Sequence, residues 1–191
     1  MRGEKEALRR ALLAKARGLS GAYRRESGAA ICANVLEMPQ YRRAKVVFAF
    51  VGGGWEVDTT PILQAVLAAG KRLCVPLCVE PGRMEARVIE DLSQLIPGSY
   101  GILEPPADSP LCPPEEIGFA AVPCLACTRV GIRLGRGGGY YDRFLAGRSF
   151  FAAALCREAL LAESLPTDPW DMPVDAVVTE NFCHIVSRQF R

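Results

Sequence analysis

The chain opens with two segments that predict helices, of which the first is amphipathic. Residues 4–17 repeat apolar side chains with the period of a helix, and Gly18 follows where such a helix would end. Lys5 and Arg9 are four residues apart and therefore share one face of this helix. Residues 23–37 predict a second helix, which ends before a proline.

A strong strand signal follows at residues 45–51, KVVFAFV. The run is too short for a helix and rich in β-branched and aromatic residues, which indicates a strand buried on both faces. Thr59 or Thr60 can cap the next helix, which Gly70 would end, and residues 72–79 predict a second strand. These elements form a βαβ unit, whose two strands we expect to be parallel.

The rest of the chain continues the alternation after a middle part rich in proline and turns. We expect one short strand in that part, at 86–89, then strands at 119–126 and 149–156 and a last one at 175–180. A glycine-rich loop and a helix from Tyr140 precede the 149–156 strand. The pattern predicts one α/β domain over residues 1–191, with an open, mainly parallel sheet flanked by helices. Ligands of such sheets bind at the carboxyl ends of the strands.

Composition narrows the class of protein. Hydrophobic residues make up 50% and charged residues 23% of the chain, and the formal net charge is +2. This charge is too small to indicate binding to nucleic acid or to an anionic membrane. The charged N-terminus lacks the apolar core of a secretory signal, and no window approaches the ~18 apolar residues of a membrane span. We expect a soluble, cytoplasmic monomer.

Eight cysteines raise the question of metal binding or disulfides. Cys124 and Cys127 have the spacing of half a zinc site, but no second pair matches them and His184 is the single histidine. Without an export signal, we interpret the cysteines as reduced and mostly buried thiols. A metal or redox role is the alternative. We expect no catalytic role for His184.

The densest motif is RVGIRLGRGGGYYDRF, at residues 129–144. Consecutive glycines let backbone N–H groups converge on a phosphate, and the start of a helix adds positive potential. Arg133 and Arg136 supply guanidinium groups that match phosphate oxygens. The motif is neither a Walker A loop nor a dinucleotide fingerprint, which would need glycine in place of Tyr140. The alternative is a flexible surface turn.

Carboxylates occur at three places near the predicted strands and the glycine loop. Asp142, just past the glycine loop, can hold Mg²⁺ beside a polyphosphate or can complement a helix dipole. Glu56 can bind an N–H-bearing heterocycle such as a pterin or can be a solvated loop acid. Asp168, Asp171 and Asp175 precede the last predicted strand, where one or more of them can complete a metal site. Without such a site they are turn acids.

Several motifs together resemble the 5-formyltetrahydrofolate cyclo-ligase family, also called 5,10-methenyltetrahydrofolate synthetase. They are GIRLGRGGGYYDRFL, the upstream WEVDT and YGILEP, the downstream DMPVDAVVTE, and Lys5 and Arg9, which fit Lys-x-x-x-Arg. Their order agrees with the family, and the likeness spans nearly the whole chain. One departure is PCLACT, where the family has Pro-Gly-x-x-Phe-Asp, so Cys124, Cys127 and Thr128 replace a glycine, an aromatic residue and an acid.

The resemblance implies a three-layer α/β sandwich and a reaction that depends on ATP and Mg²⁺. In that reaction, 5-formyltetrahydrofolate would be phosphorylated on its formyl oxygen and then attacked by its own N10. The products would be 5,10-methenyltetrahydrofolate, ADP and phosphate. Two alternatives are a folate-binding or storage protein without turnover and another small-molecule kinase or ligase with the same fold.

The resemblance also implies roles for individual residues. ATP would contact Lys5, Arg9, Arg133, Leu134, Gly135, Arg136, Gly137, Gly138, Gly139, Tyr140 and Tyr141. The folate substrate would contact Val51, Glu56, Arg136, Gly137, Gly138, Gly139 and Tyr140. Arg136 and Tyr140 would be catalytic. Asp142 and Asp171 would be the magnesium ligands, and whether Asp175 joins them is left open.

Overall fold

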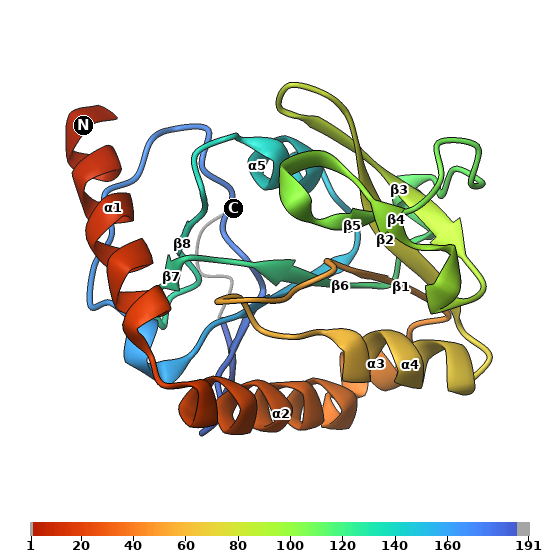
Figure 1. Ribbon diagram of the computed structural model, residues 1–191, viewed down its shortest axis with the longest axis horizontal. Helices are drawn as coiled ribbons and strands as arrows, with labels where there is room; N and C mark the ends of the chain where they lie inside the picture. Colours follow the sequence, from red (N-terminus) through yellow and green to blue (C-terminus); the bar gives the residue numbers. More distant parts are fainter. Residues whose placement is uncertain (1, 187–191) are drawn as a thin grey trace.

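The apolar run at 45–51 forms an interior strand of the sheet, β1 (Val46–Ala49), and all four residues of β1 are buried. The computed structural model describes residues 2–186 (Figure 1). Strands β6 and β2 pair with β1 on either side, both in parallel. A strand with parallel neighbours is covered on both faces, which explains why its sequence is continuously apolar.

The helices are α1 (Arg2–Gly18), α2 (Gly21–Glu37), α3 (Pro39–Arg43), α4 (Thr60–Ala68) and α5 (Tyr140–Leu145). The main sheet contains β1, β2 (Arg72–Glu80), β3 (Arg83–Ile89), β6 (Phe119–Pro123), β9 (Phe151–Leu155), β10 (Ala176–Val178) and β11 (Cys183–Ile185). Two small ribbons lie outside it: β4 (Ile96–Pro97) with β5 (Leu103–Glu104), and β7 (Ala126–Cys127) with β8 (Arg133–Leu134). Short 3₁₀ helices are η1 (Leu92–Gln94), η2 (Ser99–Gly101), η3 (Pro114–Glu116) and η4 (Glu158–Leu160).

The main sheet has seven strands in the order β11-β10-β9-β6-β1-β2-β3. The five inner strands run parallel, and β3 and β11 add an antiparallel strand at each edge. The predicted βαβ unit is β1–α4–β2, with Val47 opposite Leu73 in the parallel register. The prediction of an open, mainly parallel α/β sheet is confirmed.

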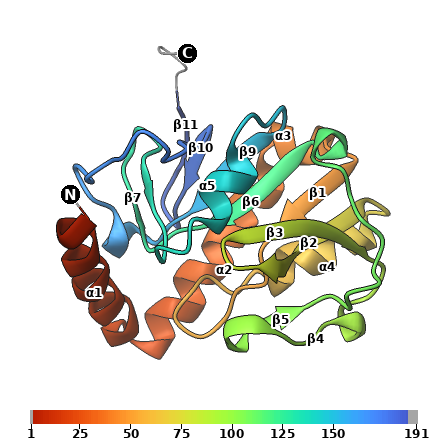
Figure 2. The same cartoon turned by 90° about the horizontal axis from the view of Figure 1, so that it is seen from above.

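Two cores cover the two faces of the sheet, because side chains alternate along each strand. Val47 and Ala49 pack with α2, α3 and α4 on one face. Val46 and Phe48 face the other side, where α1, α5 and loops contribute to the second core. Figures 1 and 2 show α2, α3 and α4 together on one side of the sheet and α5 on the other. The three-layer arrangement is therefore confirmed.

Some local predictions were wrong or incomplete. The 175–180 strand is not the last, because β11 follows it and pairs with β10. The middle part contains more than a short strand, since β3 forms a long hairpin with β2 and β4 pairs with β5. Thr59 precedes α4, but its hydroxyl does not cap the helix; it donates to Phe50 O over 2.6 Å and accepts from Gly52 N. None of the described helices is long and apolar enough to span a bilayer.

Candidate active site

The glycine loop lies between β8 and α5 and is shaped by two left-handed backbone positions. Gly137 has a φ of 96° and Gly139 a φ of 70°, backbone values that residues other than glycine rarely adopt. A Cβ on Gly137 would also lie 3.3 Å from the guanidinium carbon of Arg9. Because α5 has only six residues, the loop amides and the arginines supply the positive potential here, more than a helix dipole does.

A cavity of about 960 Å³ opens beside this loop, next to the residues that follow β1 and at the end of β6. All the residues to which the family resemblance gives a role line it: Lys5, Arg9, Val51, Glu56, Arg133, Leu134, Gly135, Arg136, Gly137, Gly138, Gly139, Tyr140, Tyr141, Asp142 and Asp171. Segments far apart in the sequence therefore meet at one place, as expected for the carboxyl ends of parallel strands.

The first helix supplies the cations at one end of the cavity. Arg9 Nε donates to the backbone oxygen of Gly135 over 3.0 Å, which attaches α1 to the glycine loop. Lys5 is buried and donates to the carboxylates of Asp168, over 2.6 Å, and Asp171. Burial alone would lower the pKa of Lys5, but the two carboxylates outweigh it and raise that pKa above its usual value.

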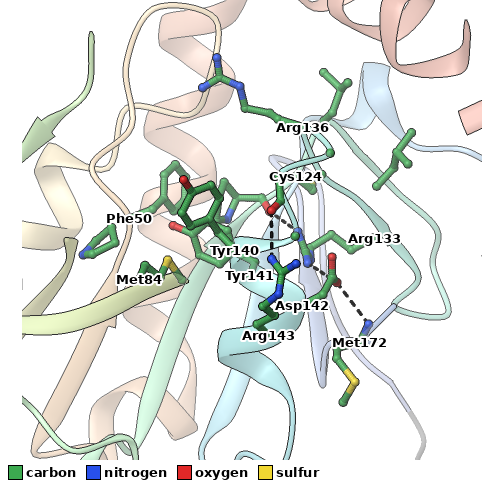
Figure 3. A pocket seen from close by; sticks show the side chains of 18 of the residues that line it. Phe50, Met84, Cys124, Arg133, Arg136, Tyr140, Tyr141, Asp142, Arg143 and Met172 are labelled. Atoms are coloured by element: carbon green, nitrogen blue, oxygen red, sulfur yellow. Dashed lines mark hydrogen bonds and ion pairs between the residues drawn. The ribbon is translucent and has the colours of Figure 1, made fainter. Parts of the chain in front are cut away.

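Asp142 lies beside Asp171 and is held by a second cation. One oxygen of Asp142 accepts from the Arg133 guanidinium over 2.7 Å and from the backbone N–H of Met172 over 3.2 Å. Figure 3 shows Arg133, Asp142 and Met172 linked in this way. Since Met172 follows Asp171 directly, the two predicted metal ligands come from neighbouring parts of the cavity wall. Arg133 is buried, and its guanidinium lies 5.7 Å from the ring centre of Tyr141.

These two aspartates suit a magnesium ion that also contacts phosphates. Mg²⁺ prefers oxygen ligands and is commonly held by one or two carboxylates together with substrate phosphates and water. No group of three or more candidate metal ligands occurs in the part of the chain that the structure describes, so a cage made only of protein is not present there. The donor set therefore fits a metal that arrives with a polyphosphate.

Glu56 lies at another part of the cavity wall, in a turn fixed by Arg157. The Arg157 guanidinium donates to the carbonyl oxygens of Trp55, over 2.8 Å, and Glu56, over 3.0 Å. Burial raises the pKa of Glu56, and the positive charges of Arg136 and Arg157 oppose that rise. The guanidinium of Arg136 lies 5.5 Å from the ring centre of Trp55, so Arg136 stands between the glycine loop and Glu56.

The apolar wall comes from the β2–β3 hairpin, the β4–β5 ribbon, the residue after β1 and the start of α5. Phe50, Met84, Tyr140 and Tyr141 group together, on the side of the cavity away from Met172 (Figure 3). Glu104 of β5 is buried and accepts hydrogen bonds from Cys78 N, over 3.3 Å, and Ser99 N, over 3.1 Å. This carboxylate fixes the ribbon to β2 and so shapes the wall.

Several lining residues were given no site role from the sequence. They are Phe50, Pro76, Cys78, Met84, Ile102, Glu104, Pro123, Leu125, Arg143, Ala146, Trp170 and Met172. Asp168 and Cys124, for which the sequence left a metal role open, also line the cavity. Glu104 lies in the YGILEP motif, which was the available signal for it. Arg157 carried no signal, because its role depends on a contact with a turn 101 residues away.

Asp175 and the Cys124–Cys127 pair have other surroundings. Asp175 is buried away from the cavity, where it accepts from Arg148 over 3.0 Å and from Ala152 N over 2.9 Å. All eight cysteines are unpaired thiols. Hydrogen bonding to Cys124 and burial raise the pKa of Cys127, which favours a protonated, unreactive thiol. These features agree with the interpretation of reduced structural cysteines.

Known proteins match this chain over most of its length. The model of the 5-formyltetrahydrofolate cyclo-ligase family matches residues 1–180. The enzyme of that name from Escherichia coli strain K12 is 29% identical over 169 residues, which cover 85% of this chain and 93% of the relative. The mitochondrial 5-formyltetrahydrofolate cyclo-ligase of Arabidopsis thaliana is 32% identical over 205 residues, with 92% of this chain and 74% of the relative covered.

Solved structures give the same answer for the fold. The NMR structure of 5,10-methenyltetrahydrofolate synthetase from Aquifex aeolicus superimposes with a TM-score of 0.85 at 34% identity, covering 98% of this chain and 94% of that one. A synthetase from Mycoplasma pneumoniae shares the fold at 19% identity, with a TM-score of 0.74. The family model matches most of the chain, and the conclusion is direct: this chain belongs to the 5-formyltetrahydrofolate cyclo-ligase family.

Proposed function

We propose that this protein converts 5-formyltetrahydrofolate and ATP to 5,10-methenyltetrahydrofolate, ADP and phosphate, with Mg²⁺ as cofactor. The observation that carries the proposal is one cavity in which a cationic, glycine-lined end adjoins an apolar end that contains the half-buried carboxyl of Glu56. A polyphosphate fits the first end and a flat heterocycle with N–H donors fits the second. The two reactants then meet at the glycine loop.

The nucleotide phosphates lie against α1 and the glycine loop in this proposal. Lys5, Arg9 and Arg133 supply positive charge, and the backbone from Leu134 to Tyr141 supplies N–H donors without obstructing side chains. Gly138 matters for a further reason: a Cβ there would lie 2.8 Å from the Tyr140 ring. The ring can thus lie close to the loop backbone and form a wall that both ligands contact.

Asp142 and Asp171 would hold the magnesium ion. A magnesium ion held there would supply positive charge against the phosphate charge that develops during phosphoryl transfer. The protein's part is to present two carboxylates from adjacent segments and to keep cations within reach of the same phosphates. Asp175 has no place in this scheme, because its carboxylate is occupied by Arg148 and Ala152.

The folate occupies the apolar end, with Val51 and Glu56 at its heterocycle. A carboxyl whose pKa is raised by burial is a strong acceptor for ring N–H groups, because water competes little for it. The Arg157 guanidinium donates two hydrogen bonds to the turn that carries Glu56, at Trp55 O and Glu56 O, and two to α2, at Ser27 Oγ and Arg24 O, so the turn is held against that helix. The carboxyl is therefore preorganised for its ligand.

The chemistry has two balanced steps. The formyl oxygen attacks the γ-phosphorus of ATP, the bond to ADP breaks, and the oxygen becomes part of a phosphate leaving group. N10 then attacks the formyl carbon, the carbon–oxygen bond breaks, and phosphate departs with the N10 proton. Arg136 neutralises the transferring phosphoryl group and Tyr140 holds the reacting atoms in line, so that positioning and charge stabilisation carry the catalysis.

One assay tests the proposal against its alternatives. Purified protein is mixed with 5-formyltetrahydrofolate and Mg-ATP, and methenyl absorbance and ADP are followed together. Equal amounts of both products support the proposed reaction. ADP without methenyl product would indicate a kinase or ligase for another substrate. Tight folate binding with neither product would indicate a folate-binding protein without turnover.

A further inference from the structure

The two cations and the metal-binding carboxylates proposed above are already paired with one another. Lys5 binds Asp168 and Asp171, and Arg133 binds Asp142. Both metal ligands of the proposed function, on which this inference rests, are therefore neutralised by groups that the same function assigns to phosphate. A metal ion alone would have to compete with these cations, and a nucleotide alone would have to compete with the carboxylates.

Lys5 lies in the position of a bound cation. Its ammonium contacts one oxygen each of Asp168 and Asp171, and its side chain is only 5% exposed. The turn that carries both aspartates is fixed independently, because Asp168 N donates to the Asp171 carboxylate over 2.7 Å and Asp171 N donates to Asp168 O over 3.0 Å. The turn and the Asp171 carboxylate are thus held by contacts that do not involve the ammonium.

A buried ammonium needs an anionic partner at every stage of ligand binding. If Asp171 turns to the metal, Lys5 retains a partner only because Asp168 is there. Both carboxylates contact Lys5, but only Asp171 adjoins Met172, whose N–H holds Asp142. Along the chain, Asp171 is therefore nearer than Asp168 to the residue that holds the other proposed metal ligand.

We propose that Asp168 is a positioning residue, which keeps the Lys5 ammonium in the site when Asp171 releases Lys5 and binds the metal. As a result, metal and nucleotide each require the other to bind. The metal–nucleotide complex carries a cation for Asp171 and Asp142 and anions for Lys5 and Arg133. When this complex binds, each of these four side chains exchanges one partner of opposite charge for another, and no charge is left unpaired in the buried site. The two ligands are coupled through these shared partners, and such coupling is reciprocal.

The first experiment measures Mn²⁺ binding without nucleotide, by electron paramagnetic resonance, in place of Mg²⁺. Lys5→Met should bind Mn²⁺ at least about tenfold more tightly than the wild type, because the competing ammonium is gone. Lys15→Met removes an exposed charge from the same helix and should leave Mn²⁺ affinity unchanged. Unchanged Mn²⁺ affinity in Lys5→Met, with circular dichroism showing an intact fold, would overturn the proposal.

The second experiment separates positioning from metal ligation. Asp168→Asn should weaken Mg-ADP binding, measured by calorimetry, by about fivefold to tenfold, and Asp168→Glu should restore part of the affinity. In the Lys5→Met background, Asp168→Asn should leave Mn²⁺ affinity unchanged, whereas Asp171→Asn should abolish the gain. A large loss of Mn²⁺ affinity in Lys5→Met with Asp168→Asn would make Asp168 a metal ligand and refute its positioning role.

The outcomes distinguish this inference from the proposed function. If the wild type forms methenyl product but Lys5→Met gains no metal affinity, the enzyme assignment stands and the partner exchange fails. If the wild type binds Mg-ADP but forms no product from 5-formyltetrahydrofolate, the activity fails while the metal measurements still decide the role of Asp168.

Discussion

Arg9 Nε donates a hydrogen bond to the carbonyl oxygen of Gly135, 126 residues later in the chain. The first helix is thereby attached to the glycine loop, and Lys5 and Arg9 of α1 line the same cavity as the arginines of the loop. In the proposed function, these charges from distant parts of the sequence act on one ligand. The effect of a substitution at each residue can be predicted separately.

Replacing Arg136 by alanine should lower kcat by about 10²–10³-fold, because a charge that stabilises the transferring phosphoryl group is lost. Arg136 is exposed and lies over Trp55, so the fold should keep its melting temperature. Steady-state kinetics and circular dichroism measure both. Arg129→Ala, which removes an exposed arginine paired with Glu158, is the control and should turn over normally. Near-normal turnover in Arg136→Ala would remove the catalytic role.

Asp142→Asn should raise the magnesium concentration needed for half-maximal rate by at least about tenfold. The amide is a weaker ligand for the ion and a weaker partner for Arg133. Rates measured over a magnesium titration at saturating ATP test this. An unchanged magnesium requirement would exclude Asp142 from the metal site.

Asp175→Asn should affect stability and not magnesium. The carboxylate is buried between Arg148 and Ala152 N, and removing one partner of a buried ion pair typically costs about 3–5 kcal/mol of the free energy of unfolding. Urea unfolding measures the loss. Molecules that remain folded should show the wild-type magnesium requirement. A changed requirement would indicate that Asp175 belongs to the metal site.

Glu56→Gln should stabilise the fold at neutral pH while weakening substrate binding. Burial raises the folded-state pKa of Glu56 above its unfolded value, so the ionised form is disfavoured in the native state. The stability of the wild type relative to Glu56→Gln should therefore fall as pH rises from the ordinary glutamate pKa through the raised one, and stay level above it.

Thermal unfolding of both proteins across that pH range tests the sign. The KM for 5-formyltetrahydrofolate should rise about 10- to 100-fold in Glu56→Gln, because a hydrogen bond to a charged acceptor is lost. A melting temperature difference independent of pH would contradict the assigned burial, and an unchanged KM would contradict the binding role.

Gly137→Ala should raise the KM for ATP, because the residue has a φ of 96° and its new Cβ would contact Arg9. The backbone strain should also lower stability by about 1–3 kcal/mol. Gly147→Ala is the matched control: Gly147 has a φ of 67° with open space around it and lies outside the cavity. It should lose stability without a change in KM. If both variants raised the KM for ATP equally, the shape of the glycine loop would not be the cause of the rise.

The sequence predicts the interior of the sheet well, because burial on both faces leaves a continuous apolar run, as in β1. It does not predict β11, whose Cys183, His184 and Ile185 are all exposed, since an edge strand with little burial has no apolar period. Thr59 shows a third case. Its type favours a helix cap, but the buried carbonyl of Phe50 takes its hydroxyl instead.

The site divides in a similar way. Arg136, Asp142 and the glycines are recognisable because their chemistry is local to one motif. The sequence offers Asp168 only as a possible metal ligand and gives no signal for Arg157, because the partners of both residues lie more than 100 residues away. Local sequence patterns carry no record of such pairings, which only the folded topology creates.

The pairing of Lys5 with Asp168 spans 163 residues and so has a consequence for biosynthesis. Chains emerge from the ribosome N-terminus first. The helix made first therefore waits for its charged partners until almost the whole chain has been synthesised. Strands β1, β2, β3, β6 and β9 precede Asp168 in the chain and can pair earlier, whereas the contact of Lys5 with Asp168 forms only afterwards. This part of the cavity wall is thus completed late, and a nascent chain interrupted before Asp168 would lack it.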